Sequence, residues 1–210
     1  MRIVNIRGAT ASGKSSIPMS MLDDPEMKII WKPYKGRQKK ILTLFPTYGW
    51  MALGAYLIKT GGMDGFDDKI LTAKAFWYAL KHYPQYNLLM EGCICSTIFS
   101  TYANLFKEAQ EKYPDADIQV VTLMPPIEEC YKRVYARNGN KPIKHVRMEE
   151  KYKNSKRSHE KFVDAGFNAW AWDNTVITDE KLIHQLEKKM DEHRKEYIQK
   201  KGKITYAIHS

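Results

Sequence analysis

The sequence predicts an α/β fold, a three-layer sandwich with a central parallel sheet, a small β-meander insert and a helical lid. Short apolar runs, typical of buried parallel strands, alternate with helical segments along most of the chain. The octet Gly-Ala-Thr-Ala-Ser-Gly-Lys-Ser at residues 8–15 lies between the first such run and the first helical segment. The 210 residues are therefore expected to form one domain, with the insert at about 26–66 and the lid at about 137–165.

The first half of the chain begins with a β-branched run, which leads into the octet and a helix. Three runs of strand-forming residues then predict the β-meander. Three glycines within residues 61–65 predict a loop. Asp67 can cap the next helix, and Pro84 ends it. In order, the predicted elements are strand 3–6, helix 14–22, strands 28–31, 41–45 and 49–57, and helix 67–82.

The second half of the chain alternates buried strands with helices. Residues 88–90 are fully apolar, as expected of a buried parallel strand. Pro126 suits the first turn of a helix, and Asn138-Gly139-Asn140 breaks the chain after it. Thr178 or Asp179 can cap the last helix. In order, the predicted elements are strand 88–90, helix 97–112, strand 118–124, helix 126–137, a basic helix 145–163 that ends at Gly166, strand 169–173 and the last helix, with Leu182, Ile183, Leu186, Met190 and Tyr197 on one face.

The octet fits the pattern G-x-x-x-x-G-K-[ST], the phosphate-binding P-loop. Its glycines let the backbone turn its N–H groups toward phosphate oxygens, and the following helix adds the positive end of its dipole. Lys14 can reach the β- and γ-phosphates, and the Ser15 hydroxyl can coordinate Mg²⁺. The predicted nucleotide-binding residues here are Gly8, Ala9, Thr10, Ala11, Ser12, Gly13, Lys14, Ser15 and Ser16.

Four further residues are candidates for catalysis. Glu91 follows an apolar strand, where a carboxylate can hold Mg²⁺ together with Ser15 or accept a proton from an attacking hydroxyl; the alternative is a helix-capping acid. Asp64, flanked by glycines, is a second candidate base, and a turn-forming aspartate is the alternative. Arg133 and Arg137 share a helix face and can clamp a transferring phosphoryl group; the alternative is a pair of surface arginines.

Positive charge is concentrated in two segments of a chain whose net charge is +10. Residues 28–40 hold six Lys or Arg and no acid, and residues 132–161 hold eleven against three Glu. Such segments favour a polyanionic partner, either a nucleotide or DNA, over a merely solvated basic face. Near the first segment, Tyr48, Trp50 and Tyr56 can stack bases or pack in the core.

Composition excludes several classes of protein. No apolar run reaches the length of a membrane span, and no secretory leader is visible. Three cysteines, an odd and low number, predict a reducing compartment, so the expected location is the cytoplasm, that of the host for a viral protein. Cys93-x-Cys95 has no second pair at zinc-site spacing, and the Asn-Lys-x-Asp motif of switch GTPases is missing.

Together these residues resemble the small P-loop kinases of the nucleoside and nucleotide kinase superfamily. The resemblance rests on Gly8–Ser15, on Leu88-Leu89-Met90-Glu91-Gly92 and on residues 129–137, which are similar to the lid helix with phosphate-clamping arginines. It implies a P-loop NTPase fold, ATP and Mg²⁺ as cofactors, and Asp173 near the adenine. Residues 26–66 depart from the helical acceptor region usual in monophosphate kinases. Some viral members act on free deoxynucleotides, and some phosphorylate hydroxymethyl groups on pyrimidines within DNA.

The sequence thus predicts an ATP- and Mg²⁺-dependent phosphotransferase that acts on a nucleotide or on a hydroxyl of a modified base in DNA. Two alternatives stay open. One is a P-loop kinase for a small metabolite or antibiotic. The other is a nucleic-acid-binding module that ATP gates, without kinase activity.

Overall fold

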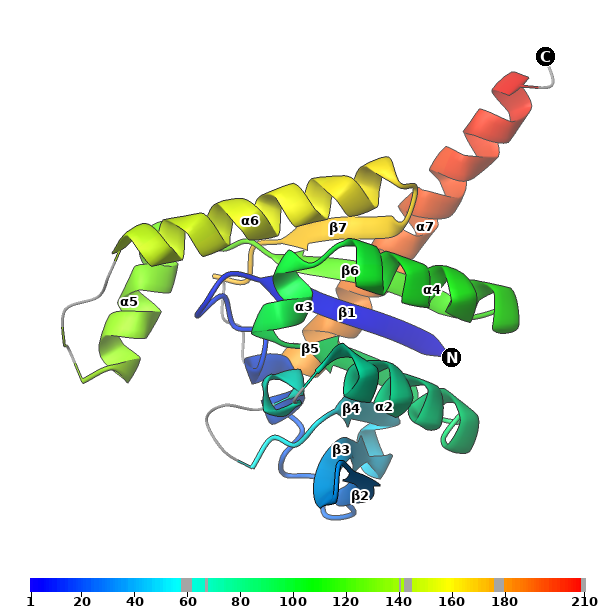
Figure 1. Cartoon of the computed structure of the whole chain (residues 1–210). Helices are drawn as coiled ribbons and strands as arrows, with labels where there is room; N and C mark the ends of the chain where they lie inside the picture. The colour runs from blue at the N-terminus through cyan, green and yellow to red at the C-terminus, as the bar shows by residue number, and fades with distance from the viewer. Residues whose placement is uncertain (58–61, 67, 140, 142–144, 176–179, 209–210) are drawn as a thin grey trace.

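The computed structural model describes residues 1–57, 62–66, 68–139, 141, 145–175 and 180–208, without the side chains of 93, 94, 145, 146 and 200–208. Its strands form one seven-stranded sheet in the order β2-β3-β4-β5-β1-β6-β7 (Figure 1). The strands are β1 (Arg2–Gly8), β2 (Lys28–Tyr34), β3 (Arg37–Phe45), β4 (Trp50–Leu53), β5 (Asn87–Glu91), β6 (Asp117–Leu123) and β7 (Asn168–Trp172). The helices are α1 (Ser16–Met19), α2 (Lys69–His82), α3 (Cys93–Thr97), α4 (Ser100–Lys112), α5 (Ile127–Arg137), α6 (His145–Asp164) and α7 (Leu182–Ile208), with 3₁₀ turns η1 (Pro46–Tyr48) and η2 (Met63–Gly65).

Helices cover both faces of the sheet, which confirms the predicted three-layer P-loop fold (Figure 1). Side chains of β1 alternate between the two faces, as the strand period of two requires. Ile3 belongs to the core under α2, α4 and α6, whereas Val4 and Ile6 pack with α1 and α7. Because β1 lies between β5 and β6 and pairs in parallel with both, the carboxyl ends of three strands meet at one edge.

The predicted β-meander is present, and it extends the central sheet. β2, β3 and β4 pair antiparallel in sequence, and β4 then pairs in parallel with β5. The prediction of a strand over 49–57 was too long, since β4 ends at Leu53 and Gly54 follows with φ +87°. A Cβ on Gly54 would lie 2.2 Å from the carbonyl oxygen of Gly62, so the close approach of these two segments needs glycine.

Three predicted helix boundaries were wrong. α1 has only four residues; Pro18 has no N–H to donate to the carbonyl of Lys14, so the regular helix begins at Ser16 and not at Lys14. The predicted helix 97–112 is two helices, α3 and α4, with a break before Ser100. Asp68 caps α2, accepting a bond from the backbone N–H of Leu71; the predicted cap, Asp67, lies outside the described residues, as do Thr178 and Asp179.

Arg7 explains the break between α3 and α4 and fixes the position of α6. Its fully buried guanidinium donates to the carbonyl of Ile98 (2.9 Å), to Ser158 Oγ on α6 (2.7 Å) and to Asn5 Oδ1 (2.8 Å). It also lies 4.7 Å from the ring centroid of Phe162. Burial lowers the pKa of Arg7 to about 10, which leaves it cationic at neutral pH. The second half of the predicted lid is therefore packed on the sheet.

Candidate active site

The P-loop turns at the carboxyl end of β1, and two of its glycines lie where a side chain would clash with neighbouring atoms. Gly8 has φ +147°, and a Cβ there would lie 2.8 Å from the carbonyl oxygen of Leu123. Gly13 has φ +96°, and its Cβ would lie 2.6 Å from Asn174 Nδ2. Lys14 is buried, and its ammonium donates to the carbonyls of Gly8 (3.0 Å) and Ala9 (2.8 Å). The loop therefore holds the Lys14 ammonium against two of its own backbone carbonyls.

Glu91, at the end of β5, meets the P-loop through Ser15. The Ser15 hydroxyl donates to Glu91 Oε2 at 3.1 Å. Glu91 is only 1% exposed, and its other oxygen, Oε1, has no hydrogen-bond partner within the described part of the chain. Burial raises the pKa of Glu91 to about 7; the negative charge of Asp64 adds to the rise, and the charge of Lys14 opposes it. Such a carboxyl group can exchange a proton near neutral pH.

Residues 62–65 lie against Glu91 and the backbone that follows it. Gly62 has φ +65°, and a Cβ there would lie 2.2 Å from Glu91 Oε1. Asp64, on the 3₁₀ turn η2, lies against the backbone after Glu91, since a Cβ on Gly92 would be 3.1 Å from Asp64 Oδ1. The structure thus brings together Lys14, Ser15, Glu91 and Asp64, four of the residues that the sequence singled out.

The two predicted arginines differ in position. Arg133, on α5, points its guanidinium at the P-loop, 3.4 Å from the carbonyl oxygen of Ser12 and 3.3 Å from that of Asn174. Its Nε is paired with Glu129 at 2.9 Å. Arg137 is the last residue of α5, and its side chain is exposed. Arg133 is thus placed beside the phosphate-binding loop, and the role of Arg137 stays a prediction.

Sequence reasoning missed two residues that touch the P-loop. Asn174 is buried and donates to the carbonyl of Ser12 at 2.9 Å, whereas the predicted neighbour Asp173 accepts bonds from the backbone and hydroxyl of Thr175 in a local turn. Lys151, on α6, donates to the Thr10 hydroxyl at 3.2 Å. The only available signal was their position: one follows the last strand at the ligand edge, and the other lies in the basic segment 132–161.

The basic segment 28–40 forms the β2–β3 hairpin at the edge of the sheet. Trp31 is 50% exposed there, and the Lys40 ammonium lies 4.9 Å from its ring centroid. Trp50 and Tyr56 are core residues, so the packing alternative holds for both. Tyr48 donates from its hydroxyl to Asp23 Oδ1 at 2.7 Å. The aromatic side chain available for stacking on this hairpin is therefore Trp31.

A metal ion would be held here by few protein ligands. No group of three or more His, Cys, Asp or Glu suited to a metal ion occurs in the part of the chain that the structure describes. The Ser15 hydroxyl and the Glu91 carboxylate nevertheless fit Mg²⁺, which usually keeps several waters and binds one or two carboxylates plus substrate phosphates. The unpartnered oxygen of Glu91 is consistent with such a role.

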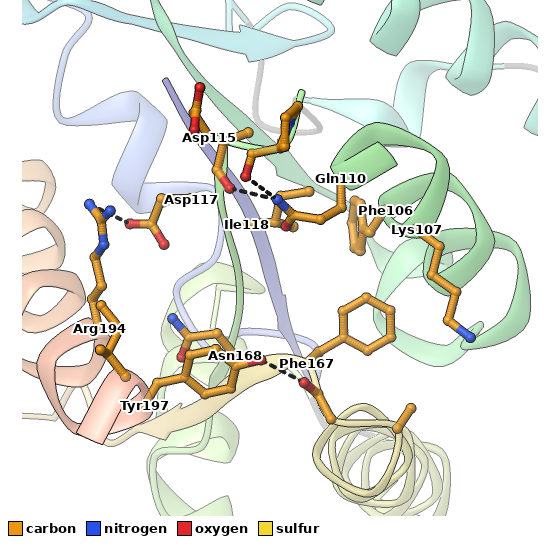
Figure 2. A pocket seen from close by; sticks show the side chains of 15 residues that line it. Phe106, Lys107, Gln110, Asp115, Asp117, Ile118, Phe167, Asn168, Arg194 and Tyr197 are labelled. Carbon is orange, nitrogen blue, oxygen red and sulfur yellow. Dashed lines mark hydrogen bonds and ion pairs between the residues drawn. The ribbon is translucent and has the colours of Figure 1, made fainter. Parts of the chain in front are cut away.

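Two cavities lie at opposite edges of the sheet. A cavity of about 260 Å³ adjoins Gly92, Asp64 and α2 on the side of the P-loop. A larger one, about 710 Å³, lies where β6 and β7 begin (Figure 2). Its polar side chains bond to their surroundings, as when Gln110 donates to the carbonyl of Pro114 and Tyr197 to that of Gly166. The larger cavity is therefore remote from the P-loop.

Among the described residues, no helix is both long enough and apolar enough to span a membrane. In comparisons with known proteins, the family model described as 5-hmdU DNA kinase matches residues 2–170. The 5-hmdU DNA kinase of Bacillus phage SP10 is 42% identical over 182 residues, which are 83% of this chain and 27% of that protein. The 5-hmdU DNA kinase 1 of Salmonella phage ViI is 29% identical, over 70% of this chain and 64% of that protein.

A third relative is closer to this chain in length. The 5-hmdU DNA kinase of Pseudomonas phage M6 is 27% identical, over 79% of this chain and 88% of that protein. The chain therefore spans about a quarter of the first relative and under two thirds of the second, but most of the third. The family model matches most of this chain, and the matched residues include the P-loop and the buried Glu91 that it contacts. This chain belongs to the 5-hmdU DNA kinase family.

Proposed function

We propose that this protein is a kinase that transfers the γ-phosphate of ATP to the hydroxymethyl group of 5-hydroxymethyldeoxyuridine in DNA, with Mg²⁺ as cofactor. The observation that carries the proposal is the contact of Ser15 with Glu91, which joins a phosphate-binding loop to a buried carboxyl group of raised pKa. The names of the phage relatives supply the acceptor. Their phage origin supports action in the cytoplasm of an infected host.

In the proposed reaction, the loop amides and Lys14 hold the phosphates of ATP, and Arg133 neutralises charge on the γ-phosphoryl oxygens. The hydroxymethyl oxygen attacks the γ-phosphorus and forms a new O–P bond. The bond from the γ-phosphorus to the bridging oxygen breaks, and ADP leaves. The proton of the hydroxyl passes to Glu91, and Asp64 is the alternative acceptor. Mg²⁺, held through Ser15 and Glu91, would supply charge stabilisation for the phosphates.

The test is transfer of labelled γ-phosphate from ATP to three acceptors: deoxynucleotides, ordinary DNA, and DNA with 5-hydroxymethyldeoxyuridine. Label in the modified DNA alone is expected. Label in free deoxynucleotides would give a nucleotide kinase instead. Salt-dependent DNA binding that ATP alters, without transfer to any acceptor, would favour the gated binding module. Transfer to a small metabolite, with no nucleotide acceptor present, would favour the remaining alternative.

Replacing Asn174 tests the contact that the structure adds to the P-loop. Asn174→Ala removes the side-chain donor to the carbonyl of Ser12, a bond of about 1 kcal/mol, so the Kd for ATP should rise about three- to tenfold. Titration calorimetry measures it, with Asn104→Ala on the exposed face of α4 as the control. If Asp173→Ala weakens ATP binding more than Asn174→Ala does, the sequence prediction for Asp173 is right and the present one wrong.

Replacing Trp31 tests the basic hairpin as part of the DNA-binding surface. Stacking of one base on an aromatic ring contributes about 1–3 kcal/mol, so Trp31→Ala should weaken DNA binding about five- to hundredfold. Fluorescence anisotropy at fixed salt measures the affinity. Ile198→Ala removes an exposed apolar side chain on α7 and should have no effect. An unchanged affinity of Trp31→Ala would remove the hairpin from the interface.

A further inference from the structure

The smaller cavity lies at the edge of the sheet that carries the two candidate bases; Asp64 is one of its lining residues, whereas Glu91 is not. The cavity borders Gly92, the residue after Glu91, and Asp64 on the 3₁₀ turn η2. Its volume of about 260 Å³ falls just below the roughly 300–1,000 Å³ of typical small-molecule sites. A cavity of this size accepts a single planar base and excludes a stack of base pairs.

The walls of the cavity suit a planar heterocycle. Four apolar or weakly polar side chains, each at most 9% exposed, form much of the lining: Met63, Phe66, Cys95 and Tyr102. The other lining side chains are polar or charged: Asp64, Asp68, Lys69 and Thr72. A mostly apolar pocket with a few polar groups is the usual form of a site that fixes the orientation of a ring.

The depth of Glu91 decides how a base in DNA could reach it. Glu91 is 1% exposed, and a Cβ on Gly62 would lie 2.2 Å from Glu91 Oε1 and 2.8 Å from the Tyr56 hydroxyl, so both residues crowd this carboxyl group. The hydroxyl of a 5-hydroxymethyl group is only two bonds from the ring, so the ring itself must enter the protein to bring that hydroxyl to Glu91 or to Asp64. A base that is still paired is flanked by its stacked neighbours and by the backbone. These cannot enter with it.

On the basis of the proposed function, we propose that the protein acts on an extrahelical nucleotide: the 5-hydroxymethyluracil base leaves the duplex stack and occupies the cavity formed by Met63, Asp64, Phe66, Thr72, Gly92 and Tyr102. Enzymes that modify bases pay a few kcal/mol to unstack them, and less where the base is mispaired. Contacts between the cavity walls and the ring would offset the free energy of unstacking.

Unstacking has a direct chemical readout. Permanganate oxidises the 5,6 double bond of a pyrimidine that has left the stack. A duplex with a single 5-hydroxymethyluracil opposite adenine, bound to the protein with a non-hydrolysable ATP analogue, is expected to gain permanganate reactivity at that base. The KM is expected to be at least about tenfold lower when the base is opposite guanine or an abasic site.

A matched pair of variants tests the cavity itself. Thr72→Phe adds a ring on the cavity side of α2, whereas Ile70→Phe adds the same ring on the exposed side. Thr72→Phe is expected to lose permanganate reactivity at the target base and at least 100-fold in phosphorylation of the duplex, with ATP affinity retained as evidence of folding. Ile70→Phe is expected to retain all three.

The outcomes separate this inference from the proposed function. If the matched duplex is phosphorylated with no gain in permanganate reactivity and with the same KM as the mispaired duplex, the base reacts while stacked and the inference is wrong. Absence of product from single-stranded, matched and mispaired DNA alike would instead contradict the proposed function. Because the permanganate assay uses the unmodified protein, a misfolded Thr72→Phe leaves the test intact.

Discussion

Lys14→Ala is expected to lower kcat for phosphotransfer by at least about 10³-fold, because phosphoryl transfer depends on charges placed around the transferring group. Lys14 is held in position by the carbonyls of Gly8 and Ala9, so its ammonium is already at the loop before a nucleotide arrives. No other lysine is among the hydrogen-bond partners of these two carbonyls in the described structure. Single-turnover transfer of labelled phosphate measures the effect.

The matched control for this variant is Lys107→Ala. Lys107 is an exposed lysine on α4 at the opposite edge of the sheet, where it lines the larger cavity (Figure 2). The Lys107→Ala variant should keep wild-type activity. It changes the net charge as Lys14→Ala does, so the comparison shows whether the position of the charge at the P-loop matters. A Lys14→Ala protein that retained activity within tenfold of the wild type would exclude the P-loop as the donor site.

Glu91→Gln is expected to lower kcat by about 10²- to 10⁴-fold, the range that general base catalysis contributes. Glutamine keeps the shape of the protonated acid but can neither accept the proton of the hydroxyl nor bind Mg²⁺ as a carboxylate. Glu108→Gln on the exposed face of α4 is the control and should be fully active. Activity of Glu91→Gln near the wild-type level would move the role of base to Asp64.

The same substitution should stabilise the metal-free protein at high pH. Burial raises the pKa of Glu91 from 4.5 to about 7, so the folded state binds more protons than the unfolded state between these values. The stability that this group contributes is therefore complete below pH 4.5, and it is lost as the pH rises through 7. By 1.36 kcal/mol per pKa unit, ionised Glu91 costs about 3 kcal/mol of folding free energy.

Urea unfolding in EDTA at several pH values measures this cost. At pH 8, Glu91→Gln is expected to have a free energy of unfolding up to about 3 kcal/mol above that of the wild type. The difference should shrink toward zero near pH 4.5, where both chains carry a neutral side chain. A variant that is less stable than the wild type at pH 8 would show that the ionised carboxylate is compensated by contacts within the fold.

Local patterns in the sequence were sufficient for the class of fold and for predicting where the phosphate donor binds. The octet at 8–15 specifies a loop through glycine conformation and fixed spacing, which do not depend on distant residues. Apolar runs such as 88–90 specify buried strands for the same local reason. Glu91 could be placed at the ligand edge because the carboxyl ends of parallel strands meet there.

The prediction of a helix boundary was wrong where a residue distant in the sequence forms a hydrogen bond with the backbone of the predicted helix. The helix predicted over 97–112 breaks because Arg7, more than ninety positions away, takes the carbonyl of Ile98. No sequence feature near Ile98 indicates that hydrogen bond. The sequence also did not indicate that the insert would join the central sheet, which it does because β4 pairs with β5. Pairing between strands far apart in the chain depends on tertiary packing, which local propensity does not encode.

The sequence by itself predicted a phosphate-binding loop at residues 8–15, with an acid and an arginine near that loop. Only the tertiary structure decided which neighbours complete the site. It placed Asn174, next to the predicted Asp173, in contact with Ser12, brought Lys151 to Thr10, and formed a cavity between η2, α2 and Gly92. The physical reason is that a P-loop is a local backbone conformation, whereas burial and contact distance arise from segments that meet only after folding.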